Sequence, residues 1–466
     1  MDGLIERSGG ARSVTSARRP RIVIIGAGFG GLSAATRLGR AEADVTVIDR
    51  HNHHLFQPLL YQIATAALSP ADIAAPIRSI LGRQRNTRVM LGTVTAIDLA
   101  SRTVIVGEHQ VPYDYLVIGT GARESYFGHD EWAAVTLGLK DIEDARTMRQ
   151  RILLAFEHAE DSDDEAERHR LMTFVIIGGG PTGVELAGSL AELSHATLAR
   201  DFRRIDPTMA RIILVEAGPR ILASFPPHLS DVAARALTRL GVELRLGTAV
   251  TDCDPDGVSL GGERIESGTV IWAAGVRASP AAEWLGLETG RDGRVAVGPD
   301  LSVPGHPEIF VIGDTATIAG PDGKPLPGVA TVAKQQGKYV ASAIKARLRG
   351  ETPAPFRYHN LGNLATIGRR EAVADFGWLR LSGRLGWLLW SAAHIYFLIG
   401  FRNRVVVAAE WLWSYLTYQR GARLILATKT PPSVSRPAAA GPAPAAPAAL
   451  PDETAPAVPA GRLLQR

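Results

Sequence analysis

The sequence predicts an α/β fold with two Rossmann-like dinucleotide-binding domains and a C-terminal helical segment. The paired domains are predicted by a repeated pattern: a buried strand, a glycine-rich turn and a helix occur in order from residue 21 and again from residue 174. The C-terminal segment is predicted by an abrupt rise in tryptophan and arginine content after residue 375. A length of 466 residues leaves room for two or three domains.

The first glycine-rich turn follows an apolar, β-branched run at residues 22–25, which predicts a buried strand. The turn has the spacing G-x-G-x-x-G. Its first glycine permits a tight turn, its second lets backbone amides approach a pyrophosphate, and its third lets the next helix pack close to the strand. The phosphates are expected at the unpaired N–H groups of that helix. The residues assigned to this site are Gly26, Ala27, Gly28, Phe29, Gly30 and Gly31.

A second predicted strand ends in Asp49, 18 positions after Gly31, where a carboxylate is expected to bind a ribose hydroxyl. Arg50 follows it and is assigned to the same end of the cofactor. Three histidines, at positions 51, 53 and 54, come next, but no carboxylate or cysteine set accompanies them. A metal site is therefore the less favoured interpretation, and no metal is expected.

Residues 88–118 alternate in the manner of antiparallel strands and end in a buried strand, Tyr115 to Ile118. Small residues follow it, which indicates a close approach of the backbone to another group. Flavoproteins with two nucleotide domains carry a similar T-G-A turn here, so Thr120 and Gly121 are assigned to the flavin nucleotide. In the same proteins an aspartate after a later buried strand accepts a hydrogen bond from a ribitol hydroxyl, and that similarity assigns Asp314.

The second glycine-rich turn follows the strand at residues 174–177, and its own carboxylate, Glu216, ends the next strand. Two complete fingerprints imply two dinucleotides. Glu216 can bond both ribose hydroxyls of NADH and would repel a 2′-phosphate, although Arg220 is close enough to weaken that preference. The residues assigned to this site are Gly178, Gly180, Pro181, Thr182, Gly183, Glu216 and Gly275.

Two helices carry candidate catalytic residues. Glu185 begins the helix after the second turn, where it either binds the nicotinamide amide or favours the helix dipole as an N-terminal charge; the first role is preferred because the nicotinamide must reach this edge of the sheet. A helix from about 329 to 348 would stabilise a reduced flavin with its positive end, and Lys334 would add to that charge. As an ordinary surface residue, Lys334 would need no explanation. Residues 140–170 are predicted to form a long helix that ends in an acidic run at 160–165, and that run is expected to be a surface loop between domains.

The C-terminal region has a distinct composition. Five of the eight tryptophans fall between residues 376 and 414, and residues 376–430 contain seven Arg or Lys and one acid, Glu410. Tryptophan with arginine is typical of a surface in the lipid headgroup layer. The apolar run at 385–401 is at the lower limit of about 17 residues for a membrane span and is interrupted at 402–404. Helices lying on the bilayer are therefore favoured over spanning helices. Residues 431–466, of which 20 of 36 are Ala or Pro, predict a disordered tail.

Electrons that reach a flavin in this chain must also leave it. A single cysteine, Cys253, excludes an internal disulfide, a dithiol relay and an Fe–S ligand set. A formal net charge of +4 over this length does not indicate nucleic-acid binding. On a membrane surface, the remaining acceptor is a lipid-soluble quinone.

The sequence resembles the type II NADH:quinone oxidoreductases, single-subunit respiratory enzymes that do not pump protons. The resemblance rests on G-A-G-F-G-G at Gly26, N-H-H-L-F-Q-P-L-L-Y-Q from Asn52, G-G-G-P-T-G-V-E from Gly178, A-K-Q-Q-G-K-Y from Ala333 and I-Y-F-L-I-G-F-R-N-R from Ile395. It implies tightly but non-covalently bound FAD, NADH as substrate, and a quinone near Gln335. Many members carry glutamine where this chain has Thr331, so contact between that position and the quinone is an open question.

These readings define five predicted segments: a flexible extension (1–20), an FAD-binding domain (21–139 and 300–350), an NADH-binding domain (140–299), a membrane-anchoring region (351–427) and a disordered tail (428–466). The expected location is the cytoplasmic face of the inner membrane, as a peripheral protein and a possible homodimer. Two alternatives are weighed. One is another two-nucleotide flavoenzyme, such as a sulfide:quinone oxidoreductase, which needs cysteines near the flavin, or a ferredoxin reductase, which needs no membrane segment. The other is a membrane flavoprotein that senses NADH.

Overall fold

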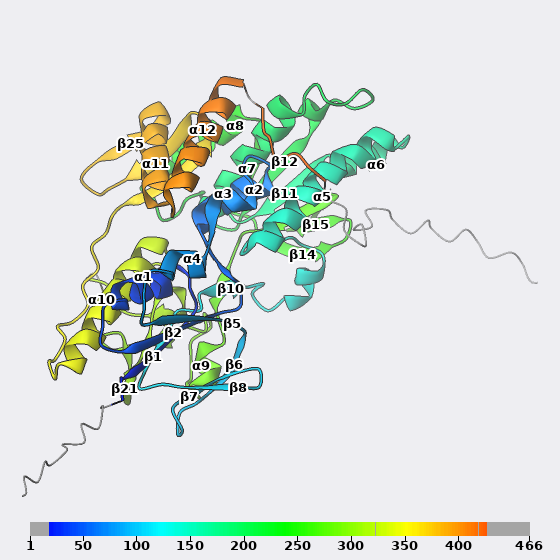
Figure 1. Ribbon diagram of the computed structural model, residues 1–466. Helices are drawn as coiled ribbons and strands as arrows, with labels where there is room; N and C mark the ends of the chain where they lie inside the picture. The colour runs from blue at the N-terminus through cyan, green and yellow to red at the C-terminus, as the bar shows by residue number, and fades with distance from the viewer. Residues whose placement is uncertain (1–17, 322, 418, 426–466) are drawn as a thin grey trace, which may run out of the picture. The chain divides into compact units, whose positions relative to one another are not determined.

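The computed structural model describes residues 18–425, except 322 and 418. The predicted tail (428–466) and nearly all of the predicted extension (1–20) lie outside the described residues. Two sheets, one in each predicted nucleotide-binding half, form the centre of the described chain; the second is parallel throughout, and the first is parallel except for its edge strand β20. A smaller antiparallel sheet with two helices follows them (Figure 1). The α/β fold class predicted from the sequence is confirmed.

The first sheet has six strands in the order β20-β21-β9-β1-β2-β5. Alternate residues of its buried strands point to opposite faces, so each face needs its own cover. One face packs against helices α1 and α10, and the other against a three-stranded sheet and α9. The strands are β1 (Arg21–Ile25), β2 (Asp44–Asp49), β5 (Thr87–Leu91), β9 (Tyr115–Ile118), β20 (Ser302–Val303) and β21 (His306–Val311); the covering elements are α1 (Phe29–Leu38), α10 (Ala330–Leu348), β6 (Val94–Asp98), β7 (Thr103–Val106), β8 (His109–Pro112) and α9 (Ala281–Trp284).

The second sheet repeats this plan with four parallel strands in the order β13-β12-β11-β17. Helices α5, α7 and α8 cover one face, and a three-stranded antiparallel sheet covers the other. Its elements are β11 (Thr173–Ile177), β12 (Arg211–Glu216), β13 (Val242–Leu246), β17 (Thr269–Trp272), α5 (Ile142–Asp161), α6 (Glu165–Leu171), α7 (Pro181–Glu192), α8 (Pro227–Arg239), β14 (Val250–Asp254), β15 (Gly257–Leu260) and β16 (Glu263–Glu266).

Two short strands cross between the halves. Strand β10 (Ala122–Glu124) pairs antiparallel with β18 (Val276–Ala278), so the chain leaves and re-enters the first half through one ribbon. After β18, helix α9 and strand β19 (Val295–Ala296) pack in the core below the first sheet, and β19 pairs with β22 (Ala316–Thr317). The chain therefore rejoins the first half soon after residue 278, earlier than the predicted boundary at 299.

The C-terminal region contains an antiparallel sheet that the sequence analysis did not anticipate. Strands β23 (Asn363–Gly368), β24 (Glu371–Asp375) and β25 (Arg380–Ser382) precede helices α11 (Gly383–Phe397) and α12 (Phe401–Thr417). The sheet packs on α7, where a Cβ at Gly188 would overlap the carbonyl oxygen of Ile367. Residues 363–382 thus join the core of the second half.

Short elements complete the described chain between the two halves and within their loops. They are β3 (His53–Leu55), β4 (Ala74–Pro76), α2 (Leu60–Ala64), α3 (Pro70–Ile73), α4 (Ile77–Leu81), a π-turn (Leu193–Thr197) and 3₁₀ turns at Gln57–Leu59, Asp130–Ala134, Pro207–Met209 and Gly313–Thr315.

Three local predictions are wrong. Residues 87–91 pair parallel with β2, whereas the sequence predicts an antiparallel strand. The alternating pattern does not show the direction, because an edge strand alternates in burial whichever way it runs. The predicted helix at 140–170 is two helices, α5 and α6, because Ser162 ends the first and the N-cap Asp164 begins the second. The break between them, at 162–164, falls within the acidic run at 160–165, and the rest of that run is helical. The C-terminal break falls at 398–400, where Gly400 has a φ of +89°, and Arg402 to Arg404 lie inside α12.

Replacing Gly188 with alanine should separate α7 from β23, because the new methyl group would meet backbone atoms that cannot move aside locally. Overpacking of this kind costs about 1–3 kcal/mol of unfolding free energy. The measurement is the thermal unfolding midpoint, with Gly180→Ala as the matched control, since a Cβ there meets no atom within 4 Å. Equal midpoints for Gly188→Ala and Gly180→Ala would contradict the close approach.

Candidate active site

The first glycine-rich turn has the geometry that its sequence predicts. Gly26 has a φ of +92°, and a Cβ on Gly26 or on Gly31 would overlap backbone oxygen atoms. A Cβ on Gly28, in contrast, would meet no atom within 4 Å. Gly28 is the N-cap of α1, and no side chain caps the helix, so the open space lies beside unpaired backbone N–H groups. An anionic pyrophosphate fits that space.

The second turn repeats this arrangement. Gly178 has a φ of +112°, and a Cβ on Gly183 would overlap the carbonyl oxygen of Gly178. Gly180 is the uncapped N-cap of α7, with φ and ψ of −71° and −179°, close to the −64° and −167° of Gly28. A Cβ on Gly180 again meets nothing within 4 Å. Pro181 and Thr182 form the first turn of α7. The chain therefore holds two equivalent cradles for a dinucleotide pyrophosphate.

The two predicted ribose carboxylates are bonded to the turns in the same way. Asp49 accepts hydrogen bonds from the backbone N–H of Ala27 at 2.6 Å and of His51 at 2.8 Å. Glu216 accepts from Gly179 at 2.6 Å and from Gly218 at 2.7 Å. Each carboxylate thus supports its turn while its remaining lone pairs are available to ribose hydroxyls.

Arg220 is held by its own loop. Its guanidinium donates to the carbonyl oxygens of Phe225 and Ala223, each at 2.8 Å, and to the hydroxyl of Ser230 at 2.6 Å. Binding a 2′-phosphate would require these bonds to break. Arg50, by comparison, is exposed and lies 4.0 Å from Asp141.

The residues assigned to the flavin meet where the first sheet joins the crossing ribbon. The Thr120 hydroxyl lies 2.5 Å from the hydroxyl of Ser279, and the carbonyl of Gly121 accepts a hydrogen bond from the Thr315 hydroxyl at 3.2 Å. Burial raises the pKa of the Asp314 carboxyl, while the charges of Lys140 and Arg294 act in the opposite direction. Sequence reasoning missed Lys140 and Arg294, because each comes from a distant segment.

Helix α10 also borders this site. It packs closely on α1 because Gly337 has no side chain: a Cβ there would overlap the carbonyl oxygen of Gly30. The buried side chain of Gln336 accepts a hydrogen bond from the Gly313 N–H at 2.6 Å and so fixes the turn before Asp314. Lys334 points toward α11, with its Nζ 4.7 Å from the ring centre of Phe397. Burial, together with Lys338 and Arg404, lowers the pKa of Lys334.

The two predicted quinone-side residues already have partners in the segment before β23. The Gln335 amide donates to the carbonyl of His359 at 2.8 Å and accepts from its N–H at 3.0 Å. The Thr331 hydroxyl lies 3.3 Å from the hydroxyl of Tyr358. A quinone that contacted Gln335 would have to replace the His359 bonds. The sequence held no signal for Tyr358 or His359.

Glu185 is buried on the side of α7 that faces the C-terminal sheet. Its carboxylate accepts a hydrogen bond from the Thr366 N–H at 3.4 Å, and burial raises its pKa to about 8. It borders a cavity of about 80 Å³, enough for a few water molecules. The other walls of this cavity include Tyr61, Gln62, Trp390, Trp411 and Arg420.

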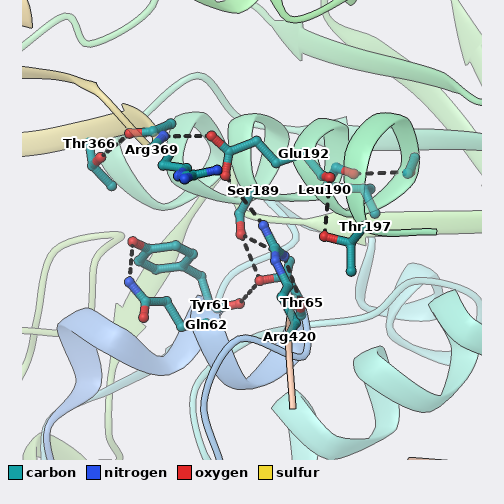
Figure 2. A network of polar contacts seen from close by, with 12 residues as sticks. Tyr61, Gln62, Thr65, Ser189, Leu190, Glu192, Thr197, Thr366, Arg369 and Arg420 are labelled. Carbon is teal, nitrogen blue, oxygen red and sulfur yellow. Dashed lines mark hydrogen bonds and ion pairs between the residues drawn. The ribbon is translucent and has the colours of Figure 1, made fainter. Parts of the chain in front are cut away.

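A polar network joins this cavity to the segment after α12 (Figure 2). The buried guanidinium of Arg420 donates to the carbonyl of Thr65 at 2.7 Å and to the hydroxyl of Ser189 at 3.3 Å, and it lies 3.4 Å from Glu192. Trp411 donates to Gln62 at 2.8 Å, and Gln62 donates to the hydroxyl of Tyr61 at 2.8 Å. The network ties α2, α7 and the chain after α12 together. The sequence held one sign of this network: Ser189 and Glu192 are three residues apart and so share one face of α7. The other members come from distant segments, which the sequence could not connect.

The C-terminal helices bury one face and expose another. Trp390 and Val407 lie in the core of the second half, whereas Leu385, Leu412, Trp413 and Leu416 are exposed. No helix within the described residues has both the length and the apolar character needed to cross a membrane.

The histidines after Asp49 do not form a metal site. The rings of His51 and His53 stack at 5.4 Å, while the buried His54 donates from Nδ1 to the carbonyl of Ala27 at 2.8 Å. Across residues 18–425, with 322 and 418 left aside, no three His, Cys, Asp or Glu side chains are grouped as metal ligands. His54 is thus another support of the first turn, which the sequence analysis had not assigned.

The fold and the paired cradles define an oxidoreductase with two dinucleotide-binding halves, and residues 20–337 match the family model of pyridine nucleotide-disulphide oxidoreductases. Residues 360–419 match the NDH2 C-terminal domain. The chain is 48% identical over 420 residues to the type II NADH:quinone oxidoreductase Ndh of Mycobacterium tuberculosis, covering 87% of this chain and 90% of that protein. It is 47% identical to NdhA of the same organism, covering 87% and 89%.

The fold agrees with these matches. NDH2 from Plasmodium falciparum, solved in complex with NADH, superposes with a TM-score of 0.81 at 20% identity, over 88% of this chain and all of that one. The chain belongs to the type II NADH:quinone oxidoreductases. The family resemblance inferred from the sequence motifs is confirmed.

Replacing Glu185 with glutamine should change how stability depends on pH. The folded protein holds the Glu185 proton up to about pH 8, whereas the unfolded chain releases it near pH 4.5. Between these values Glu185 ionises in the unfolded chain alone, which favours unfolding, so the free energy of unfolding falls as the pH rises. The loss is at most about 1.4 kcal/mol per pH unit. The unfolding free energy of the wild type, measured in urea from pH 5 to 8, should fall relative to that of Glu185→Gln. Parallel curves would show that Glu185 ionises normally.

Proposed function

We propose that this protein oxidises NADH through a tightly but non-covalently bound FAD and reduces a membrane quinone, without translocating protons. One observation carries the proposal: two pyrophosphate cradles of matching geometry lie in the two halves, each with its own ribose carboxylate. FAD, when bound, would accept a hydride from nicotinamide and release two electrons to a quinone. Turnover needs one further proton, because NADH supplies a single hydride.

The first cradle is assigned to FAD and the second to NADH. The first half supplies Thr120, Gly121 and Asp314 where a flavin and its ribitol would lie, as the family resemblance implies. In the second half, Glu216 favours a ribose with free hydroxyls. Arg220, which could otherwise bind a 2′-phosphate, already donates its hydrogen bonds to its own loop. NADH is therefore the preferred donor.

One rival assignment, a sulfide:quinone oxidoreductase, lacks support among the described residues. A sulfide:quinone oxidoreductase needs redox-active cysteines, but Cys253 is buried on β14, and burial raises the pKa of its thiol to about 12. A thiol with that pKa is not a useful nucleophile. An NADH sensor would share the cradles but not sustained turnover, so kinetics distinguish it.

The purified protein tests the proposal directly. It should be yellow, lose its flavin absorbance on adding NADH without oxygen, and regain it on adding a short-chain quinone. Steady-state kcat/KM should favour NADH over NADPH by at least about tenfold, as expected from repulsion between Glu216 and a 2′-phosphate. Protein without flavin, or flavin that NADH reduces but no quinone reoxidises, would refute the proposal. Slow reoxidation by every quinone would favour the sensor.

The same proposal includes a peripheral location on the cytoplasmic face of the inner membrane. Exposed apolar side chains on α11 and α12 lie beside exposed Arg384, Arg402 and Arg404, and Glu410 is the one acid on these helices. Apolar and aromatic side chains with arginine suit the headgroup layer of an anionic bilayer. The homodimer stays a prediction.

Replacing Leu412, Trp413 and Leu416 together with serine should release the protein from vesicles. These side chains are exposed, so the fold should be retained, whereas truncation at residue 376 would remove Trp390 and Arg420 from buried positions. The measurement is co-sedimentation with vesicles that contain phosphatidylglycerol, together with ferricyanide reduction, which should not change. Leu91→Ser with Met209→Ser is the matched control, at exposed apolar positions of the two nucleotide-binding halves. Unchanged sedimentation of the triple variant would exclude α12 as the docking surface.

A further inference from the structure

Phe127 occupies a backbone position that suits other residues better. The turn Tyr126–His129 is closed by a hydrogen bond from the His129 N–H to the Tyr126 carbonyl at 3.1 Å. Its two central residues have positive φ, +54° at Phe127 and +103° at Gly128. Positive φ at both central positions is the pattern of a type I′ turn, which strongly favours Asn-Gly. A bulky side chain there strains the backbone.

Burial of the ring does not compensate for this strain. Phe127 is 69% exposed, whereas its neighbours Tyr126 and Trp132 are buried in the core of the second half. On its inner side the ring lies near Trp272, with the two ring centres 6.2 Å apart, and near the backbone, since a Cβ on Gly275 would lie 2.5 Å from the Cζ of Phe127. The small residue that the sequence analysis assigned to the cofactor is thus covered by Phe127 on that side.

The ring stands at the edge of the second sheet where a dinucleotide binds. Gly275 follows β17, whose neighbour β11 leads directly into the second glycine-rich turn. The N–H of Ala273 donates to the Ile177 carbonyl at 2.7 Å, and a Cβ on Gly178 would lie 2.6 Å from the carbonyl carbon of Ala273. Phe127 is therefore close to the cradle formed at Gly178–Gly183.

The ring also stands at the start of the route to the flavin. The Ser125 N–H donates to the Gly275 carbonyl at 3.1 Å, and from there the β10–β18 ribbon runs to Thr120 and Ser279. In Figure 1, β10 runs between the two halves. A nicotinamide held at the second cradle would have to extend along this ribbon to reach a flavin in the first half.

We propose that Phe127 is a positioning residue for NADH: its exposed ring packs against the nicotinamide half of the dinucleotide and orients it toward the flavin. The inference rests on the proposed function and adds a specific contact to it. An aromatic ring offers a flat apolar surface to a nicotinamide, and its π face also attracts the positive charge of the oxidised ring. On this proposal, phenylalanine is kept at position 127 despite the strained backbone, because Asn or Gly would fit the turn but would offer no aromatic ring to the nicotinamide.

Phe127→Asn separates this role from a structural one. Asparagine suits positive φ, so the variant should unfold at the wild-type temperature or above it. The flavin-loaded protein is titrated with 1,4,5,6-tetrahydro-NADH, a redox-inactive analogue, and separately with ADP-ribose, which lacks the nicotinamide. The variant should bind the analogue about three- to tenfold more weakly than the wild type, the range expected for loss of an aromatic contact, and ADP-ribose equally well. Phe127→Tyr, which keeps the ring, should bind both like the wild type.

The outcomes are distinct. Equal binding of the analogue by Phe127→Asn and the wild type would overturn the inference, as would equal weakening for both ligands, which would place the contact on the ADP half. A lower unfolding temperature in Phe127→Asn would show that the ring stabilises the turn and would also overturn it. If the wild type binds neither ligand, the proposed function itself fails.

Discussion

The close approach of helix α7 to strand β23 is the constraint on which much of this structure depends. At Gly188 the helix has no side chain, so the backbone of Ile367 can lie against it. That contact holds the C-terminal sheet on the same helix whose N-terminus forms the second cradle. Glu185, Ser189 and Glu192 then line a small cavity. A carboxyl group with a raised pKa at Glu185 follows from this packing, because the packing buries the group and disfavours its charged form.

The same packing gives Arg420 its role. Its guanidinium is buried beside Glu192 and satisfies the Thr65 carbonyl and the Ser189 hydroxyl. Removing one member of such a pair would leave an uncompensated buried charge, which typically costs about 3–5 kcal/mol. The chain that follows the exposed face of α12 is in this way tied to both nucleotide-binding halves. The surface proposed to dock on lipid and the helix proposed to hold NADH therefore belong to one packed unit.

The two cradles have nearly the same backbone geometry but are assigned different dinucleotides. Their turns, N-caps and carboxylates correspond, so the difference must come from what surrounds them. Around the first cradle lie Thr120, Asp314 and the packed helices α1 and α10. Around the second lie the self-bonded Arg220 and the exposed ring of Phe127. We propose that the two cradles differ in specificity because of these surrounding segments, which lie outside the turn sequences.

The amino-acid sequence by itself determined the paired βαβ halves, both glycine-rich turns, the carboxylate that ends a strand beside each turn, and the family, because these depend on local patterns: apolar runs, glycine spacing and a charged residue at a strand end. Tertiary structure alone decided the antiparallel sheet at 363–382, the parallel direction of β5 and the partners of Gln335 and Arg220. Composition likewise could not separate the buried Trp390 from the exposed Trp413. Such features depend on which distant segments meet, and no local pattern encodes that.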